Sequence, residues 1–299
     1  MRSDVQSSAE FLRLPGVSPD GVTEFYRDVV GLPSMRSYPG IEMLWGGEDA
    51  AFELKYETTP DPSDESDPAT AQLIPVLRSY DLAATRERLA AAGHPPVLEQ
   101  ERHGAQTFYV LGPDGLLTGF TFRDPASTLP ADVEALRRWT SGARRLPNTP
   151  PMAPELQYVC RIVLHASDVA RSSAFYRDAY GLDLVAEEAK SRVHTLGDTA
   201  VLEIAPGGEQ RPVPADRFSV KGTFLLRCHD LDALTRDAFA AGARSVGDEI
   251  FYDVGVRIRY LADPDGAVAG FIQRTDAGGG EEDFEANRRW ASRASASVS

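Results

Sequence analysis

Two apolar, β-rich segments in the second half of the chain each carry a pair of polar residues four positions apart. Segment 158–166 carries Arg161 and His165, and segment 222–228 carries Thr223 and Arg227. Because side chains alternate along a strand, each pair shares one strand face. An arginine there offers a fixed positive charge and planar N–H donors to an anionic or enol oxygen.

A tyrosine precedes each of two similar turn motifs. Tyr260 stands three residues before the turn 263–266 (Asp-Pro-Asp-Gly), and Tyr109 three residues before the turn 112–115 (Gly-Pro-Asp-Gly). A phenol beside a ligand can hydrogen-bond an oxygen or act as a general acid. The duplication favours the alternative that both tyrosines are packing residues.

Composition and motifs exclude several classes of function. There is no glycine-rich phosphate loop and no Ser/His/Asp or Cys/His set at catalytic spacing. Cys160 and Cys228 form no CxxC motif, which argues against a cysteine zinc site or a disulfide scaffold. The net charge of −14 argues against nucleic acid and anionic membranes as partners. The chain shows no apolar targeting or membrane-spanning run, so we expect a cytoplasmic protein.

The chain repeats itself once, with a shift of about 150 residues. The repeated motifs are Phe-Tyr-Arg-Asp at 25–28 and 175–178, Phe-Glu-Leu at 52–54 with Leu-Glu-Ile at 202–204, and Arg-Arg-Trp at 137–139 and 288–290. A repeat of this length predicts two related halves. Within them, hydrophobic periodicity and capping signals predict four strand–helix–strands units, near 9–57, 72–124, 157–205 and 221–274.

The order and spacing of these motifs resemble the vicinal oxygen chelate superfamily, which includes glyoxalase I, the extradiol dioxygenases and the bleomycin-type resistance proteins. The resemblance implies an α+β fold in which four βαβββ units form two paired, half-open barrel domains. The tandem form looks most like the extradiol dioxygenases, with the two units of each half paired together. The implied segments are the domains 1–124 and 156–275, a linker with a short helix at 125–155, and a C-terminal helix and tail at 276–299.

The superfamily takes its metal ligands, usually His and Glu, from set places on the first and last strands of its units. In the second half these places fall on Arg161, Thr223, Gly270 and Glu203, and in the first half on Phe11, Ile74, Gly119 and Glu53. The segment 50–54 around Glu53 looks like the metal-bearing strand of glyoxalase I. Glu10 is one residue out of phase with Phe11, and a bulge would rephase it.

One carboxylate beside an arginine, without a histidine, does not make an iron or zinc site. We therefore expect neither a metal nor another cofactor. Arg161 would supply a fixed positive charge in place of a cation and pair with Glu203, or the two would form a salt bridge in an inactive remnant of the site. The catalytic candidates are Arg161, Glu203, Tyr260 and His165, and the substrate-binding candidates are Thr223, Arg227 and Gly270.

Three functions remain open. The first is a dioxygenase- or glyoxalase-like enzyme that acts without a metal on a small aromatic or oxygenated metabolite in the cavity of the C-terminal domain. The second is a binding protein that sequesters such a molecule, as resistance proteins do. The third is a metal-dependent dioxygenase with atypical ligands. In each case the expected partner is a small molecule, and self-association into a homo-oligomer stays open.

Overall fold

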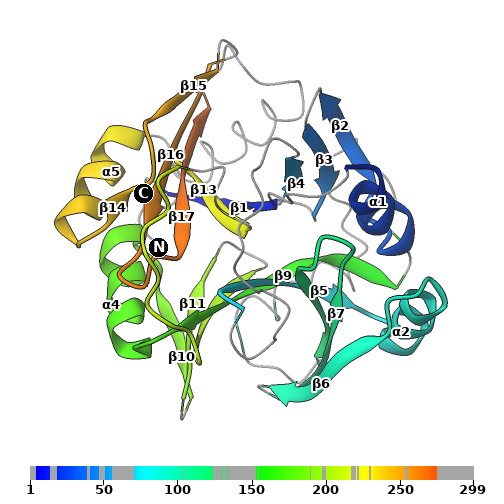
Figure 1. Cartoon of the computed structure of the whole chain (residues 1–299). Helices are drawn as coiled ribbons and strands as arrows, with labels where there is room; N and C mark the ends of the chain where they lie inside the picture. Colours follow the sequence, from blue (N-terminus) through cyan, green and yellow to red (C-terminus); the bar gives the residue numbers. More distant parts are fainter. Residues whose placement is uncertain are drawn as a thin grey trace.

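The computed structural model describes most of the predicted units. The described residues are 5–13, 19–38, 41–46, 51–55, 71–102, 104–123, 129, 133, 153, 155–188, 190–196, 200–216, 220, 222–228, 230–252 and 255–274. They form four strand–helix–strands units in two curved sheets (Figure 1), which confirms the α+β class and the βαβββ units. The predicted linker helix, both Arg-Arg-Trp segments and the C-terminal helix lie outside the described residues.

Each unit begins with one strand, continues into a helix and ends with further strands. The first contains β1 (Val5–Arg13), α1 (Pro19–Glu24), the π-helical segment η1 (Phe25–Val29), β2 (Ser34–Tyr38), β3 (Ile41–Trp45) and β4 (Ala51–Lys55). The second contains β5 (Leu73–Ser79), α2 (Leu82–Ala91), β6 (Pro96–Arg102), β7 (Ala105–Leu111) and β8 (Leu117–Arg123). The third contains β9 (Leu156–Ala166), α4 (Val169–Tyr180), β10 (Leu184–Glu187), β11 (Arg192–Thr195) and β12 (Val201–Pro206). The fourth contains β13 (Gly222–Cys228), α5 (Leu231–Ala240), β14 (Arg244–Ser245), β15 (Ile250–Tyr252), β16 (Val256–Ala262) and β17 (Val268–Arg274).

The units pair across the two halves of the chain. β1 of the first unit pairs antiparallel with β13 of the fourth, and β5 of the second with β9 of the third. The strands of the first and fourth units form one sheet, which we call the outer-unit sheet; its order is β14-β16-β17-β13-β1-β4-β3-β2, with β15 beside β16. The strands of the second and third units form the other sheet, which we call the inner-unit sheet; its order is β10-β11-β12-β9-β5-β8-β7-β6. The expectation that each half of the chain closes its own sheet is therefore wrong.

Local signals set the helix ends where the sequence places them. Asp81, Asp168 and Asp230 cap α2, α4 and α5, because each carboxylate accepts a hydrogen bond from the backbone N–H three residues on. The helix α4 ends at Gly181, whose φ of +67° is in the left-handed region that favours glycine. No helix in the described part of the chain is long and apolar enough to cross a membrane.

A shared apolar core lies between the helices and the sheets. In Figure 1, α4 and α5 stand at one side of the molecule and α1 and α2 at the other, with the two sheets between them. The core includes Phe25, Tyr26, Phe175 and Tyr176, the aromatic pairs of the repeated Phe-Tyr-Arg-Asp motif. Each sheet turns its other face away from this core, and we call that face the concave face because the sheets curve around it.

Strand alternation decides which side chains reach each concave face. On β9, Ile162 and Leu164 belong to the shared core, so the intervening Arg161, Val163 and His165 face the other way. On β13, Phe224, Leu226 and Cys228 enter the core, which leaves Thr223, Leu225 and Arg227 on the concave face of the outer-unit sheet. The shared faces that the sequence predicts within each strand are therefore confirmed.

Candidate functional site

An arginine and a glutamate meet on the concave face of the inner-unit sheet. Nη1 of Arg161 donates a hydrogen bond to Oε2 of Glu203 at 2.9 Å, and the two side chains are only 5% and 2% exposed. The parallel strands β9 and β12 bring them together, because Arg161 lies opposite Val201 and Glu203 opposite Val163. The predicted ion pair is confirmed. Such burial is tolerated only because each charge has the other as partner.

The remaining predicted residues of the site lie elsewhere. Thr223, Arg227, Tyr260 and Gly270 stand on β13, β16 and β17, which belong to the outer-unit sheet. The concave face of that sheet is separated from Arg161 by the shared core. The expectation that all these residues line one C-terminal cavity with Arg161 is therefore wrong, and the cause is the crossed pairing of the units. Their roles in binding or catalysis stay predictions.

Two of these residues have evident local roles. The Thr223 hydroxyl donates a hydrogen bond to the Val268 carbonyl oxygen at 2.7 Å, so it fastens β13 to β17. A Cβ at Gly270 would lie 2.2 Å from the Arg259 carbonyl oxygen and 2.8 Å from Cδ2 of Leu225. Gly270 is thus needed for close approach of the backbones of β16 and β17. Arg227, paired with Ile272, is partly exposed at its strand.

Replacing Gly270 with alanine is expected to lower the free energy of unfolding by about 1–3 kcal/mol, because the new methyl group overlaps a backbone carbonyl that cannot rotate away. Gly21 in α1 is the matched control, since a Cβ there has no neighbour within 4 Å. Gly21→Ala should leave stability unchanged or raise it, by up to about 1 kcal/mol. Urea denaturation of both variants gives the comparison. Equal stabilities would contradict the close approach at Gly270.

The crossed pairing places Tyr109, instead of Tyr260, in the same sheet as Arg161, three strands away. The register runs from Arg161 to Val76 on β5, from Val76 to Gly119 on β8, and from Gly119 to Tyr109 on β7. Tyr109 is buried, and its hydroxyl accepts a hydrogen bond from Nε2 of Gln100 at 2.9 Å. Sequence reasoning treated Tyr109 as a packing residue of another domain, although it has the same offset from its turn as Tyr260.

A second buried arginine lies on the same face and was also missed. Arg78 follows Val76 by two residues on β5, and it lies opposite Thr121 of β8. Because Leu77 between them belongs to the shared core, Val76 and Arg78 point together to the concave face. The alternation of the segment 74–78 was the signal for it. The inner-unit sheet therefore brings two buried arginines to one face.

His165 lies on the face of Arg161, as predicted, but at some distance along the strand. Nδ1 of its ring is 2.7 Å from the Ala71 carbonyl oxygen, and the side chain is buried. The four-residue separation from Arg161 corresponds to about 13 Å of strand. This hydrogen bond fits a structural histidine that fastens β9 to the segment before β5. Its catalytic role stays a prediction.

The residues of the inner-unit sheet do not fit the metal that the superfamily implies. The crossed pairing brings together the ligand places occupied by Arg161, Ile74, Gly119 and Glu203. Only Glu203 has a ligand side chain, and Arg161 already holds it. Within the described ranges, no three His, Cys, Asp or Glu residues are grouped so that they could hold a metal ion. The described residues at this place therefore do not supply the ligand set of such a metal.

In the outer-unit sheet, the residue that corresponds to Arg161 is displaced by one position from the expected one. Ala51 pairs with Glu10, just as its counterpart Val201 pairs with Arg161. Glu10 therefore occupies the register position of Arg161, and the assignment of that position to Phe11 is wrong. The reason is a connection one residue longer, since α1 begins nine residues after Glu10 and α4 begins eight after Arg161.

Comparisons with known proteins agree with this fold. Residues 161–270 match the family model of the glyoxalase-like domain. The structure of glyoxalase I from Zea mays superposes with a TM-score of 0.61 at 17% identity, over 91% of this chain and 93% of that chain. A candidate dioxygenase from Bacillus subtilis subsp. subtilis str. 168 superposes with a TM-score of 0.57 at 15% identity, over 97% of both chains. No curated protein matches the chain by sequence. The superpositions show that the chain has the fold of these proteins, and residues 161–270 are similar to a glyoxalase-like domain.

Proposed function

We propose that this protein binds a small aromatic or oxygenated molecule on the concave face of the inner-unit sheet and acts on it there without a metal. The fold alone supports an enzyme or a binding protein of the superfamily. The finer proposal rests on one observation, the buried pair of Arg161 and Glu203 at the place of the metal ligands. The guanidinium cation of Arg161, which is part of the chain, takes the place of a metal cation that would have to be bound.

The guanidinium of Arg161 suits a ligand that carries a carboxylate, a phenolate or an enolate. Its planar N–H groups can bind two neighbouring oxygens, and bonds to a charged oxygen are roughly twice as strong as neutral ones. Glu203 holds Nη1 and so fixes the plane in which the guanidinium lies. Tyr109, oriented by Gln100, supplies a phenol on the same face that can donate a proton or a hydrogen bond.

Sequestration without turnover is the second candidate function. It is favoured by the ion pair itself, because the hydrogen bond from Arg161 occupies the carboxylate that would otherwise serve as a general base. The partner is a small molecule under both proposals. A cytoplasmic location and a homo-oligomeric state remain predictions that bear on neither.

Salicylate, an aromatic carboxylate with a neighbouring phenol, is a suitable probe for calorimetric titration. Arg161→Lys is expected to weaken salicylate binding by about tenfold or more, because a lysine lacks the planar two-donor contact. Tyr109→Phe should weaken it by a smaller factor. Tyr260→Phe is the matched control, since Tyr260 lies in the other sheet, and it should leave binding unchanged.

Two outcomes would contradict this placement. Weaker binding in Tyr260→Phe, with Arg161→Lys unaffected, would move the ligand to the outer-unit sheet. No binding by the unaltered protein would exclude this ligand class. Mass spectrometry of the recovered probe then separates the two functions, because turnover changes salicylate and sequestration returns it intact.

A further inference from the structure

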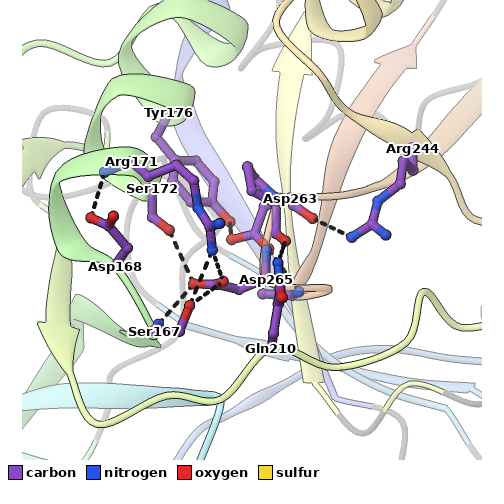
Figure 2. A network of polar contacts seen from close by, with 11 residues as sticks. Ser167, Asp168, Arg171, Ser172, Tyr176, Gln210, Arg244, Asp263 and Asp265 are labelled. Carbon is purple, nitrogen blue, oxygen red and sulfur yellow. Dashed lines mark hydrogen bonds and ion pairs between the residues drawn. The ribbon is translucent and has the colours of Figure 1, made fainter.

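The turn between β16 and β17 carries a buried aspartate that holds the start of α4 (Figure 2). Asp265 is 1% exposed and accepts hydrogen bonds from the backbone N–H of Ser167 at 2.8 Å and from its hydroxyl at 2.6 Å. The guanidinium of Arg171 and, at 3.3 Å, the hydroxyl of Ser172 donate to the same carboxylate. Asp265 therefore makes a charged joint between the turn and the helix.

A second aspartate in this turn is equally buried but has no basic residue on its carboxylate among these contacts. Oδ1 of Asp263 accepts hydrogen bonds from the backbone N–H groups of Asp265 at 2.8 Å and Ala267 at 2.9 Å. Oδ2 accepts one from the Tyr176 hydroxyl of α4 at 3.2 Å. Arg244 reaches only the backbone carbonyl oxygen of this residue, at 3.1 Å.

The surroundings of Asp263 disfavour a negative charge. The pKa of its carboxyl group is raised to about 6, mainly by burial and in smaller part by the neighbouring Asp265 charge, while the three hydrogen bonds oppose the rise. Tyr180 lies nearby with its ring stacked on Phe271, and its buried hydroxyl has no hydrogen-bond partner. Burial raises the pKa of Tyr176 and Tyr180 as well, so both phenols stay protonated and neutral.

This joint connects the two sheets. The turn belongs to the outer-unit sheet, whereas α4 belongs to the third unit, whose strands lie in the inner-unit sheet. The equivalent turn of the first half has Gly112 in the place of Asp263. There the Tyr26 hydroxyl bonds to the Thr118 hydroxyl at 3.0 Å instead of to a carboxyl group. The turn of the first half therefore has no counterpart of the Asp263 carboxyl group.

We propose that Asp263, Asp265 and Tyr176 form a proton-responsive clamp between the third and fourth units, tight when Asp263 is protonated and looser when it is ionised. In the protonated state the Asp263 carboxyl group is neutral, so its hydrogen bond with Tyr176 places no charge in the core. Ionisation places a second carboxylate beside Asp265, and in the contacts described above an arginine side chain donates to the carboxylate of Asp265 but not to that of Asp263. The proposal is independent of the ligand proposed for Arg161.

The charged groups on the neighbouring elements do not cancel this response. Arg171 of α4 is engaged by Asp265, and Arg244 of β14 by a carbonyl oxygen. Asp237 of α5 lines a cleft of about 580 Å³ between α4 and α5, together with Arg171 and Pro264. This cleft brings solvent to the outside of the turn, so protons have a short path to the clamp.

The direction of the pH effect follows from the raised pKa. The favourable contribution of Asp263 is complete below the ordinary pKa of an aspartate and is lost as the pH rises through about 6. Asp263→Asn keeps an oxygen for both backbone N–H groups and adds a donor for Tyr176, but it cannot ionise. The unfolding equilibrium constant of the unaltered protein, relative to this variant, is expected to rise about tenfold between about pH 5 and about pH 7.5.

Two further variants make the test specific. Tyr176→Phe removes a hydrogen bond that favours the ionised carboxylate, so the midpoint of the pH effect should move upward. Asp114→Asn, in the equivalent turn that lacks a counterpart of Asp263, should show the pH profile of the unaltered protein. Hydrogen exchange at Ala267, corrected for its intrinsic pH dependence, should show protection that falls with rising pH and stays level in Asp263→Asn. A constant difference between the unaltered protein and Asp263→Asn at all pH values would overturn the proposal.

Discussion

Replacing Arg161 with alanine is expected to lower the free energy of unfolding by about 3–5 kcal/mol, as for other buried charges left without their partner. The variant leaves the Glu203 carboxylate, 2% exposed, without the hydrogen bond from Nη1. It also leaves a cavity beside Val76 and Val201, the register partners of Arg161. Urea denaturation at neutral pH measures the loss.

The controls separate loss of a partner from loss of a charge. Arg161→Met combined with Glu203→Leu removes both charges and should be near the unaltered protein in stability, because apolar replacement of a buried pair is often neutral or better. Arg27→Ala breaks an ion pair whose side chains are 42% and 55% exposed, and should cost at most about 1 kcal/mol. If Arg161→Ala costs no more than Arg27→Ala, the pair is not buried as described.

Asp265→Ala should be about as damaging, with a loss of about 3–5 kcal/mol. The carboxylate accepts hydrogen bonds from two groups of Ser167 and from Arg171 and Ser172. Its removal leaves these donors at the start of α4 without their acceptor, and one of them, the Ser172 hydroxyl, belongs to a buried residue. Thermal or urea unfolding followed by circular dichroism measures the effect.

Asp114 offers a control within the same chain, because it has the equivalent place in the other turn. Its side chain is partly exposed and accepts a hydrogen bond from the Leu116 backbone N–H at 3.1 Å. Asp114→Ala should cost only about 1 kcal/mol. Similar losses in the two variants would show that Asp265 acts as a turn residue and not as a link between the sheets.

Local features of this chain could be predicted from the sequence because short-range physics sets them. The caps at Asp168 and Asp230 depend on hydrogen bonds within three residues. The faces of β9 follow from alternation, and the contact between Arg161 and Glu203 depends only on neighbouring strands of one unit. Each of these predictions required no knowledge of how the units pair.

The pairing of units could not be predicted in this way. The first strands β1, β5, β9 and β13 each pair through one backbone edge with the first strand of another unit. Because the chain repeats itself, the sequence pattern of these strands is the same for both possible choices of partner. The wrong choice placed Tyr260 beside Arg161, whereas the register leads to Tyr109. The shift from Phe11 to Glu10 arose similarly, since a connection longer by one residue leaves no mark in the strand pattern.

We propose that the guanidinium cation of Arg161, which is part of the chain, takes the place of a bound metal ion at this site. Elemental analysis of the purified protein, with salicylate titration before and after treatment with a chelator, tests it most directly. We expect iron, zinc, manganese and nickel at far below one equivalent per chain, and an affinity for salicylate that the chelator does not change. About one tightly held transition metal per chain, whose removal abolishes salicylate binding, would contradict the account.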